Sequence, residues 1–346
     1  MTALELAREM GHEEVILVQD AAAGLRAVIA IHDTTLGPAV GGTRMRLYPT
    51  LDDAMVDALR LARAMTYKAA LAEMPRGGGK AVILGDPARD KTRALLAAYA
   101  RAVDRLAGRF QSGADMGIDA RDVAVMSRIT RHVSHTPPDA KVDTAELAAL
   151  GVLASIRAAA AESGRSLDGL HVAVQGLGQV GYRLARMLRK AGARLTVADV
   201  DPGRAERAAA ELPAAVVAPD AIYDVEADVF SPNAAGGILN DATVPRLRCR
   251  AVAGAANEQL AEGRHGDTLH ERGILYGPDY VVNAGGLLSL LFELGETDEE
   301  GVTRRVEAIG GRLSSLWERA RREKIPPHRL ADRIAEERLA AARTRR

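Results

Sequence analysis

Short apolar runs of strand length and longer amphipathic segments alternate along the first part of the chain. The apolar runs predict strands at residues 14–18 (EVILV), 25–31 (LRAVIAI) and 81–84 (AVIL). Residues 109–117 (RFQSGADMG) are predicted to be a strand that ends in a small-residue loop carrying Asp115. A long helix is predicted at residues 90–107. Residues 37–45 (GPAVGGTRM) hold too many glycines for an ordinary strand interior, so this backbone is expected to approach another group closely.

A further amphipathic helix is predicted to begin after Thr50, because Asp53 follows three residues later in a weaker form of the capping box. Its apolar stripe carries, at helical spacing, Ala54, Ala58, Leu61, Met65 and finally Lys68. Lys68 therefore points where a core is expected. Two interpretations are open, since its charged end can reach solvent along an apolar stem or can contact a ligand.

The second half of the chain has the pattern of a nucleotide-binding unit. After a predicted helix at 145–162, a strand at 170–175 (LHVAVQ) leads directly into GLGQVG. In that loop Gly176, Gly178 and Gly181 satisfy the pattern G-x-G-x-x-G in its required place between a strand and a helix.

The helix after these glycines opens with Gln179 and Val180, and the next strand, ARLTVAD, ends in Asp199. An acidic side chain about 20 residues past the glycines can accept hydrogen bonds from the ribose hydroxyls of NAD. The alternative is a glycine turn that only packs a helix on a sheet. Strand, helix, second strand and terminal acid together favour dinucleotide binding, with Gln179 and Val180 included in the predicted cofactor site.

Three later runs also read as strands: ADVFSPN, RAVAGAAN and YVVN. They end in Asn233, Asn257 and Asn283. Because ligands lie at the carboxyl ends of parallel strands in such sheets, these asparagines are candidate cofactor contacts, and Asn257 is also a candidate substrate contact. Loop-forming turns are an equally good explanation of the asparagines.

Composition narrows the possible functions. The 346 residues are enough for two domains, and 46 basic residues balance 46 acidic ones. A net charge near zero gives no electrostatic reason to expect nucleic acid or a membrane as a partner. Cys249 is the only cysteine, so no disulfide framework and no cysteine-based metal site are expected. With no evident leader or membrane-spanning run, a cytoplasmic location is expected.

The stretch MPRGGGKAVI places Lys80 directly after three glycines. A phosphate-binding loop would require a further glycine where Met74 stands and a serine or threonine at Ala81, so ATP binding is disfavoured. Lys80 needs another explanation.

Six motifs together carry a family resemblance: GPAVGGTRM, MTYKAALAEMPRGGGKAVI, SGADMG, VQGLGQVG, AGAANEQL and YGPDYVVNAGG. In order and spacing, over roughly residues 14–295, the chain resembles the leucine, phenylalanine and valine dehydrogenases, relatives of glutamate dehydrogenase. The resemblance implies oxidative deamination, in which an L-amino acid and NAD give a 2-oxo acid, ammonium and NADH. It also implies that Lys68 holds the substrate carboxylate, that Lys80 is the catalytic base and that Asp115 moves protons at the substrate nitrogen.

These implied roles make a chemical demand on Lys80. A base must be neutral, whereas an unperturbed lysine has a pKa near ~10.4. Burial and the like charge of Lys68 are both expected to favour the neutral form. Asp115 has an alternative interpretation as a salt-bridge partner of Lys80 only.

The resemblance also indicates a substrate pocket that includes Gly41 and Gly42. Glutamate enzymes of the family have a lysine where this chain has Val40, so a second carboxylate would lack a partner. The expected lining is Val40, Met65, Gly113 and Leu287. This lining favours a large apolar amino acid, with phenylalanine slightly ahead of leucine, valine and isoleucine.

Two features depart from the family pattern. The connection HVSHTPPDAKVDT, residues 132–144, is short and poor in glycine, which leaves the hinge geometry open. Glu258 follows Asn257 where relatives often have a second asparagine, which puts the neighbouring contact in doubt.

The predicted architecture is α/β with two domains and a cleft. Residues 1–139 are expected to form the substrate-binding and oligomerisation domain, to which a C-terminal helix at about 325–346 returns, and residues 140–324 a Rossmann-type, doubly wound NAD domain. Related enzymes are homo-oligomers, commonly octamers or dimers. Two alternatives stay open: a glutamate dehydrogenase, and a non-catalytic NAD-binding sensor with the same fold.

Overall fold

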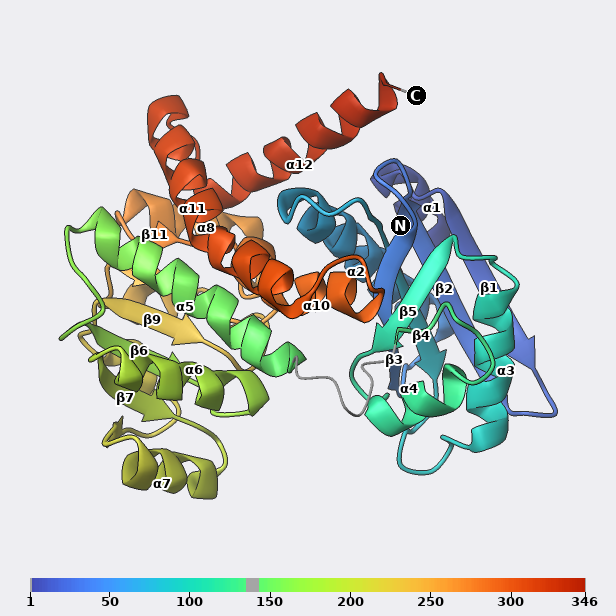
Figure 1. The fold of residues 1–346 in the computed structure, drawn as a ribbon, viewed down its shortest axis with the longest axis horizontal. Helices are drawn as coiled ribbons and strands as arrows, with labels where there is room; N and C mark the ends of the chain where they lie inside the picture. The colour runs from blue at the N-terminus through green and yellow to red at the C-terminus, as the bar shows by residue number, and fades with distance from the viewer. Residues whose placement is uncertain (1, 135–142, 346) are drawn as a thin grey trace. The chain divides into compact units, whose positions relative to one another are not determined.

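The computed structural model describes residues 2–134 and 143–345. The chain forms two compact units: unit 1 consists of residues 1–140 and 335–346, and unit 2 of residues 141–334 (Figure 1). The connection 132–144 noted in the sequence lies largely outside the described residues.

Unit 1 is built on a five-stranded mixed sheet. Its strands are β1 (Glu14–Asp20), β2 (Leu25–Asp33), β3 (Ala39–Arg46), β4 (Gly77–Leu84) and β5 (Phe110–Ala114), in the order β1-β2-β4-β3-β5. β2 runs antiparallel to both β1 and β4, whereas β3 runs parallel to β4 and β5. The glycine-rich segments around Gly41 and Gly78 therefore lie within strands, which makes β4 longer than the predicted 81–84.

Helices cover both faces of this sheet. They are α1 (Ala3–Met10), α2 (Leu51–Leu71), α3 (Arg93–Asp104) and α4 (Ala120–Met126). One core cluster joins α2 to Val28 and Val82, and another joins α3 to Ile29 and Ile83. Because side chains alternate along a strand, Lys80 shares the α2 face with Val82.

Helix α2 begins as predicted. The Asp53 backbone N–H donates to Thr50 Oγ1 over 3.1 Å, and the Thr50 N–H donates to Asp53 Oδ2 over 3.0 Å. This reciprocal capping box satisfies two backbone donors that the first turn leaves without partners, and it fixes the start of the helix that carries Lys68.

Unit 2 contains a six-stranded sheet in which every strand pair is parallel. Its strands are β6 (His171–Gln175), β7 (Arg194–Ala198), β8 (Ala215–Val216), β9 (Val229–Pro232), β10 (Ala251–Val252) and β11 (Leu275–Tyr276), in the order β11-β10-β9-β6-β7-β8. The chain winds outward in one direction from β6 and in the other from β9. This is the doubly wound, Rossmann-type topology, with its switch point between β6 and β9.

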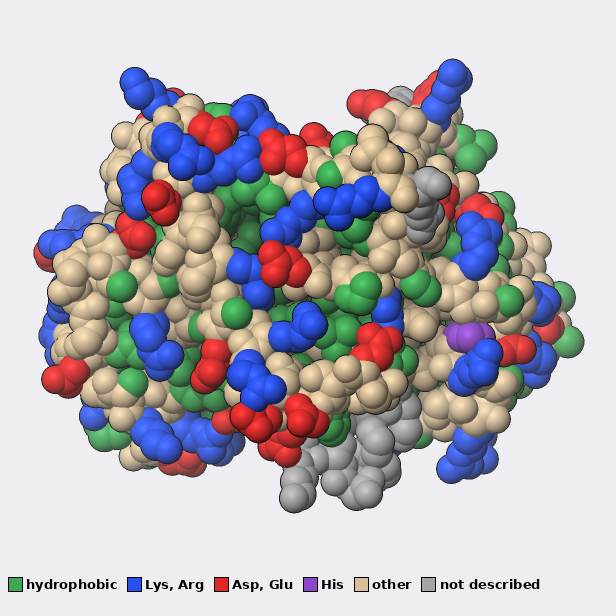
Figure 2. Space-filling model, turned by 45° about the horizontal axis from the view of Figure 1, so that its top comes forward, with side chains coloured by type: hydrophobic (Ala, Val, Ile, Leu, Met, Phe, Trp, Pro, Cys, Tyr) green, Lys and Arg blue, Asp and Glu red, His purple; other side chains and the backbone are tan. Residues whose placement is uncertain are grey.

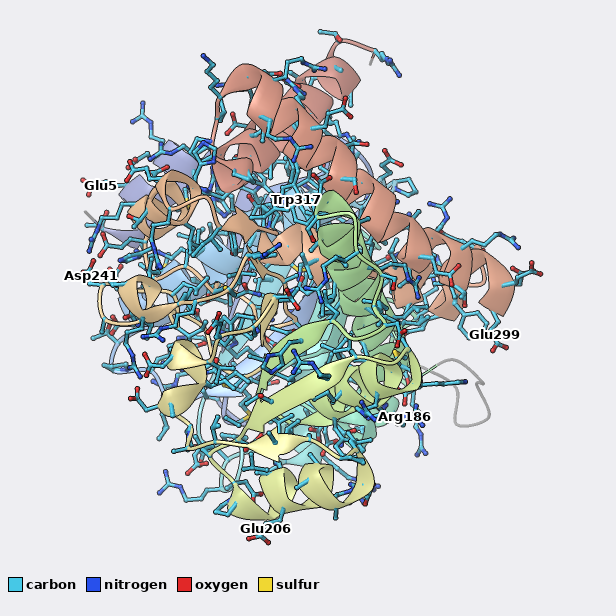
Figure 3. All side chains as sticks on the ribbon, turned by 90° about the vertical axis from the view of Figure 1, so that its left-hand side faces the viewer. Glu5, Arg186, Glu206, Asp241, Glu299 and Trp317 are labelled. Atoms are coloured by element: carbon cyan, nitrogen blue, oxygen red, sulfur yellow. The ribbon has the colours of Figure 1, made fainter. Side chains whose placement is uncertain are left out.

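The helices of unit 2 are α5 (Thr144–Glu162), α6 (Gln179–Lys190), α7 (Pro202–Glu211), α8 (Gly263–Glu271), α9 (Asp279–Val282), α10 (Gly285–Glu293) and α11 (Glu299–Glu323), with short 3-10 turns at Ala221–Asp224 and Val244–Arg246. The last helix, α12 (Pro327–Arg343), begins in unit 2, and its residues from Ala335 onward belong to unit 1. Trp317 of α11, labelled in Figure 3, is fully buried and donates its indole N–H to the Tyr276 carbonyl over 2.8 Å.

The prediction of a strand at YVVN was wrong, because these residues belong to α9 and the turn that follows it. β-branched residues favour strands, but here Pro278 precedes the run and its carbonyl accepts from the Val282 N–H over 3.0 Å. Pro278 is the N-cap of α9, where its missing N–H costs the helix no hydrogen bond.

Helix α5 is the one helix of the described residues that is long and apolar enough to cross a membrane, with a mean hydropathy of 1.4 over its most apolar window. Of that window, 67% is buried. A core helix of a folded unit has the same composition, and α5 packs against α6, α10 and α11. On the face of the molecule drawn in Figure 2, acidic and basic side chains are interspersed, in keeping with their equal numbers.

Candidate active site

The centre of the site in unit 1 is Lys80 of β4. Its side chain is only 8% exposed, and its Nζ lies 2.7 Å from Asp115 Oδ2. Burial lowers the pKa of Lys80, because the charged ammonium loses its hydration, and this outweighs the opposing attraction of Asp115. A lysine with a lowered pKa is suited to accept a proton.

Asp115 lies in the loop directly after β5, and its Oδ2 also accepts from Arg44 Nε over 3.1 Å. Burial alone would raise the Asp115 pKa, but the charges of Lys80 and Arg44 outweigh it, so the pKa of this carboxyl is lowered. The carboxylate is thus ionised beside the lysine. The ion pair fits both interpretations of Asp115, as a proton carrier and as a structural partner.

Glycines let four elements, β3, β4, β5 and α2, approach one another around this pair. A Cβ on Gly41 would lie 1.8 Å from the Gly79 carbonyl oxygen, and one on Gly42 would lie 2.4 Å from the Ala114 carbonyl oxygen. A Cβ on Gly78 would lie 2.0 Å from the backbone nitrogen of Thr66 on α2. The expected close backbone approach at residues 37–45 is confirmed, and the packing of β4 on α2 requires the same property.

The predicted pocket residues of unit 1 differ in their burial and in the space around them. Val40 is buried on β3, and Met65 and Lys68 are half-buried on α2. Gly113 pairs with Gly42 across β5 and β3, and a Cβ built on Gly113 meets no atom within 4 Å. Gly113 therefore faces open space, unlike the tightly enclosed Gly41 and Gly42.

Two predicted substrate residues lie in unit 2: Leu287, half-buried on α10, and Asn257, in the loop after β10. Asn257 Oδ1 accepts from Asn283 Nδ2 over 2.8 Å. Their assignment to the substrate stays a prediction.

The fingerprint glycines follow β6 at the switch point, and each has a separate geometric reason. Gly176 has φ of +86°, a conformation that side chains disfavour. A Cβ on Gly181 would lie 1.9 Å from the Gly176 carbonyl oxygen, so the helix packs closely on the turn. At Gly178 the nearest atom to a built Cβ is Arg204 Nη1 at 4.0 Å, which leaves the loop open to a ligand.

The N-terminus of α6 also suits an anion. Gly178 is the N-cap and provides no capping side chain, so the backbone N–H groups at Gln179 and Val180 lie at an uncapped helix end. Asp199 Oδ2 accepts from the Leu177 N–H over 2.6 Å, and Oδ1 accepts from the Asp201 N–H over 2.8 Å. The Asp199 carboxylate therefore fixes the glycine loop from the end of β7.

A cavity of about 740 Å³ opens beside Gly178 and Gln179. Its wall includes Arg183, Arg186, Arg204 and Arg207, together with Asp143, Glu146 and Glu211. Arg183, Arg186 and Arg207 were not among the site residues predicted from the sequence. Their spacing along α6 and α7, the helices after the glycines and after Asp199, is the signal that could have identified them.

Three asparagines meet around Ala255 at the carboxyl ends of β9 and β10. Asn233 Oδ1 accepts from the Ala255 N–H over 2.9 Å, and Asn283 Nδ2 donates to the Ala255 carbonyl over 3.2 Å as well as to Asn257. Asn283 Oδ1 is buried without a hydrogen-bond partner. The three predicted asparagines thus form one cluster, although Asn283 comes from α9 and not from a strand.

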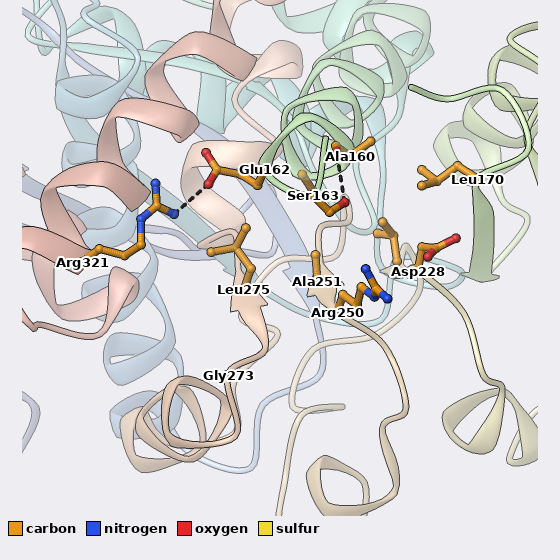
Figure 4. A pocket seen from close by; sticks show the side chains of 12 residues that line it. Ala160, Glu162, Ser163, Leu170, Asp228, Arg250, Ala251, Gly273, Leu275 and Arg321 are labelled. Atoms are coloured by element: carbon orange, nitrogen blue, oxygen red, sulfur yellow. Dashed lines mark hydrogen bonds and ion pairs between the residues drawn. The ribbon is translucent and has the colours of Figure 1, made fainter. Parts of the chain in front are cut away.

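A smaller cavity of about 240 Å³ lies at the opposite, amino-terminal edge of the same sheet (Figure 4). Asp228 and Arg250 line it, and Glu162 pairs there with Arg321 over 2.7 Å. It contains none of the predicted site residues. Within the described residues no group of three acidic, histidine or cysteine side chains is placed to hold a metal ion.

A Rossmann-type sheet with a complete glycine fingerprint, in one chain with a buried lysine–aspartate pair, is the combination expected of a nucleotide-dependent dehydrogenase. Sequence comparison gives the family. The model of the Glu/Leu/Phe/Val dehydrogenase dimerisation domain matches residues 12–136, and the Glutamate/Leucine/Phenylalanine/Valine dehydrogenase model matches residues 203–346. The chain belongs to this family of amino acid dehydrogenases. A TrkA-N domain model also matches residues 172–225, which include the fingerprint.

Several curated relatives match over nearly their full length. Leucine dehydrogenase of Geobacillus stearothermophilus is 44% identical, covering 97% of this chain and 92% of the relative. L-tryptophan dehydrogenase of Nostoc punctiforme is 46% identical, covering 98% and 97%. Phenylalanine dehydrogenase of Lysinibacillus sphaericus is 42% identical, covering 96% and 90%. The predicted family is confirmed, and the tryptophan enzyme is a relative that the sequence analysis did not anticipate.

Solved structures agree. The crystal structure of the Nostoc punctiforme tryptophan dehydrogenase matches with a TM-score of 0.86 at 44% identity, covering 98% of this chain and 99% of that one. A hetero-hexameric glutamate dehydrogenase from Thermus thermophilus matches with a TM-score of 0.81 at 25% identity, covering 99% and 95%. The predicted α/β class is confirmed, and this glutamate enzyme is a more distant relative than the leucine, tryptophan and phenylalanine enzymes.

Proposed function

We propose that the protein catalyses the reversible, NAD-dependent oxidative deamination of a large apolar L-amino acid to the 2-oxo acid and ammonium. The observation that carries the proposal is the buried Lys80–Asp115 pair, in a chain 42–46% identical to leucine, tryptophan and phenylalanine dehydrogenases.

The residues of unit 1 perform the proton chemistry in this proposal. NAD, when bound, supplies the acceptor for the hydride from the substrate Cα. Neutral Lys80 deprotonates the water that attacks the iminium carbon of the oxidised substrate, and burial favours that neutral form. Ionised Asp115 exchanges protons with the substrate nitrogen. Lys68 holds the substrate carboxylate.

Unit 2 is proposed to hold NAD. The open approach at Gly178 and the uncapped N-terminus of α6 at Gln179 and Val180 fit the pyrophosphate, with Gly176 and Gly181 shaping the turn. Asp199 is assigned to the ribose from the spacing of the fingerprint, and its negative charge disfavours the 2′-phosphate of NADP. The asparagine cluster of Asn233, Asn257 and Asn283 offers amide groups to the nicotinamide end and to the substrate.

The substrate pocket is proposed to comprise Val40, Gly41, Gly42, Met65, Gly113 and Leu287. Val40 provides no cation for a second carboxylate, and the open space at Gly113 accommodates a large side chain. Phenylalanine is placed slightly ahead of leucine, valine and isoleucine. Tryptophan joins this set because a tryptophan dehydrogenase is among the relatives.

The domain assignment is also a proposal: a substrate-binding and oligomerisation domain at 1–139 with the end of the C-terminal helix, and an NAD domain at 140–324. The family model over 12–136 is described as a dimerisation domain, which supports a homo-oligomer, either a dimer or an octamer. The single cysteine supports a cytoplasmic location.

The test is a panel of L-amino acids incubated with NAD, with NADH formation followed by absorbance. Large apolar amino acids should give the highest kcat/KM, and glutamate should be poor. A preference for glutamate would overturn the pocket assignment. NAD binding without turnover of any amino acid would instead favour a non-catalytic sensor.

A further inference from the structure

Behind the Lys80–Asp115 pair lies a second cation that the proposed chemistry does not use. Arg44 of β3 is on the same face of the sheet as Lys80, and its side chain is 14% exposed. Its Nε donates to Asp115 Oδ2 over 3.1 Å, and its Nη1 donates to Asp57 Oδ2 over 3.2 Å. One guanidinium therefore bridges two carboxylates that come from different elements.

Asp57, on the first turns of α2, is held from its other side. Tyr48, in the segment between β3 and α2, donates its hydroxyl to Asp57 Oδ2 over 2.6 Å. Burial raises the pKa of Tyr48, and the neighbouring Asp57 adds to this effect, so the hydroxyl keeps its proton. The result is a continuous chain of hydrogen bonds from Tyr48 through Asp57, Arg44 and Asp115 to Lys80.

We propose that Arg44 is a positioning residue of the amino acid dehydrogenase reaction: it fixes the Asp115 carboxylate against Lys80 and sets a positive charge, balanced by Asp57, beside that lysine. This inference rests on the proposed roles of Lys80 and Asp115. Arg44 touches neither substrate nor cofactor in this scheme, and it acts through Asp115.

The geometry explains why an arginine is needed. Asp115 lies in the loop after β5, and its Oδ2 is contacted by Lys80 Nζ over 2.7 Å and by Arg44 Nε over 3.1 Å. The hydrogen bond from Nε adds a second restraint on the orientation of the carboxylate. Since Nε and Nη1 lie at fixed positions in a planar fork, one arginine can hold Asp115 and Asp57 together, whereas a lysine has a single nitrogen on a flexible stem.

The charged groups around Lys80 determine whether each one raises or lowers the pKa of this lysine. The groups that face it are Asp115 after β5, Arg44 from β3 and Asp57 from α2, and α2 also carries Lys68. Arg44 opposes a second positive charge and so lowers the pKa of Lys80, whereas Asp57 raises it. The like charge expected from Lys68 stays a prediction. Arg44 and Asp57 thus act on the same base in opposite directions.

Because Arg44 and Asp57 shift the pKa of Lys80 in opposite directions, their variants can be distinguished from variants that only disturb the structure. The rate of a reaction that needs neutral Lys80 rises with pH through the pKa of that lysine. Arg44→Met should move this acidic limb of the kcat/KM profile to higher pH, and Asp57→Asn should move it to lower pH. Arg44→Met should also lower kcat roughly 10- to 100-fold through misplacement of Asp115.

Two comparison variants sharpen the measurement. Arg44→Lys restores the positive charge but not the planar guanidinium group. The acidic limb of the kcat/KM profile should therefore return toward the wild-type pH, whereas kcat should recover only in part. Tyr48→Phe removes the donor to Asp57 and leaves all charges in place, so its limb should stay at the wild-type pH. NAD affinity, a property of unit 2, should be unchanged in all four variants.

A second measurement separates this inference from the proposed function. The chain has only six lysines, so the 13C-methylated amines of the reductively methylated wild-type and variant proteins give a simple NMR spectrum in which Lys80 can be titrated directly. Its midpoint should rise in Arg44→Met and fall in Asp57→Asn even if no amino acid is turned over. Midpoints that move in the same direction in both variants, or that do not move, would overturn the role of Arg44.

Discussion

Lys80 Nζ lies 2.7 Å from Asp115 Oδ2, and both groups belong to unit 1, whereas the glycine fingerprint belongs to unit 2. The proposed proton chemistry and the proposed cofactor binding therefore reside in different units of the chain. Changes at the lysine–aspartate pair should lower kcat without altering NAD affinity. Changes at the glycine loop should lower NAD affinity.

Asp115→Asn should lower kcat on the order of 10²- to 10⁴-fold, because it removes the proposed proton-transfer group at the substrate nitrogen. The measurement is steady-state NADH formation with a saturating apolar amino acid. Asp122→Asn is the matched control, since it breaks another short lysine–aspartate pair of unit 1, with Lys91 at 2.6 Å. If both substitutions cost the same, Asp115 is only a structural partner.

Gly113→Ala should lower kcat/KM for phenylalanine more than for valine. A Cβ at this position meets no protein atom within 4 Å, so the added methyl occupies space available to substrate, and one such group changes discrimination by ~1–3 kcal/mol. Gly42→Ala is the contrasting variant, because its Cβ would lie 2.4 Å from the Ala114 carbonyl oxygen. That variant should lose stability and activity with every substrate. Equal effects of Gly113→Ala on both substrates would contradict the pocket assignment.

NAD should give a clearly higher kcat/KM than NADP. The Asp199 carboxylate at the end of β7 would repel a 2′-phosphate, although Arg204 lies 3.9 Å from it and offers a cation once the acid is neutralised. Asp199→Asn should therefore narrow the preference, and Asp201→Asn, at a 52% exposed side chain, should change it less. Equal values for the two cofactors in the wild-type protein would refute the assignment of Asp199.

Acid should destabilise unit 1 through His32. This histidine is buried, its Nδ1 lies 2.8 Å from Thr66 Oγ1, and burial lowers its pKa to about 4. Below pH 6.5 His32 binds a proton in the unfolded chain, whereas buried His32 in the folded chain binds one only near pH 4. The free energy of unfolding therefore falls as the pH falls through this window.

The expected loss from His32 alone is about 2 kcal/mol between pH 7 and pH 5, measured as the free energy of unfolding in urea. His32→Gln should flatten this part of the pH dependence, whereas His270→Gln, at an exposed position, should leave it unchanged. An unaltered slope in His32→Gln would show that other groups control the acid response.

Much of the fold could be predicted because local patterns and tertiary structure agree. The capping box at Thr50 and Asp53, the strand before Gly176 and the helix after it are determined by residues close together in the chain. The run YVVN was misassigned because strand propensity is weak against a preceding proline and the packing of α9.

Residues of the candidate site could be predicted from the sequence only where an individual residue stands out from its neighbours in the chain. Lys80 and Asp115 stand out beside glycines, but the bridge from Arg44 to Asp57 joins β3 to α2 and depends on the sheet order. Arginine and aspartate at such positions look like ordinary surface charges in the sequence. The glycine backbone contacts, such as that of Gly78 with Thr66, likewise become visible only when strand and helix are placed together.

The most direct test of the account is the turnover of Lys80→Ala, measured as NADH formation from NAD and an apolar L-amino acid, beside NAD affinity measured by calorimetry. We predict a loss of kcat on the order of 10²- to 10⁴-fold or more, with NAD affinity unchanged because the cofactor residues lie in unit 2. A Lys80→Ala protein that turns over at nearly the wild-type rate would contradict the account.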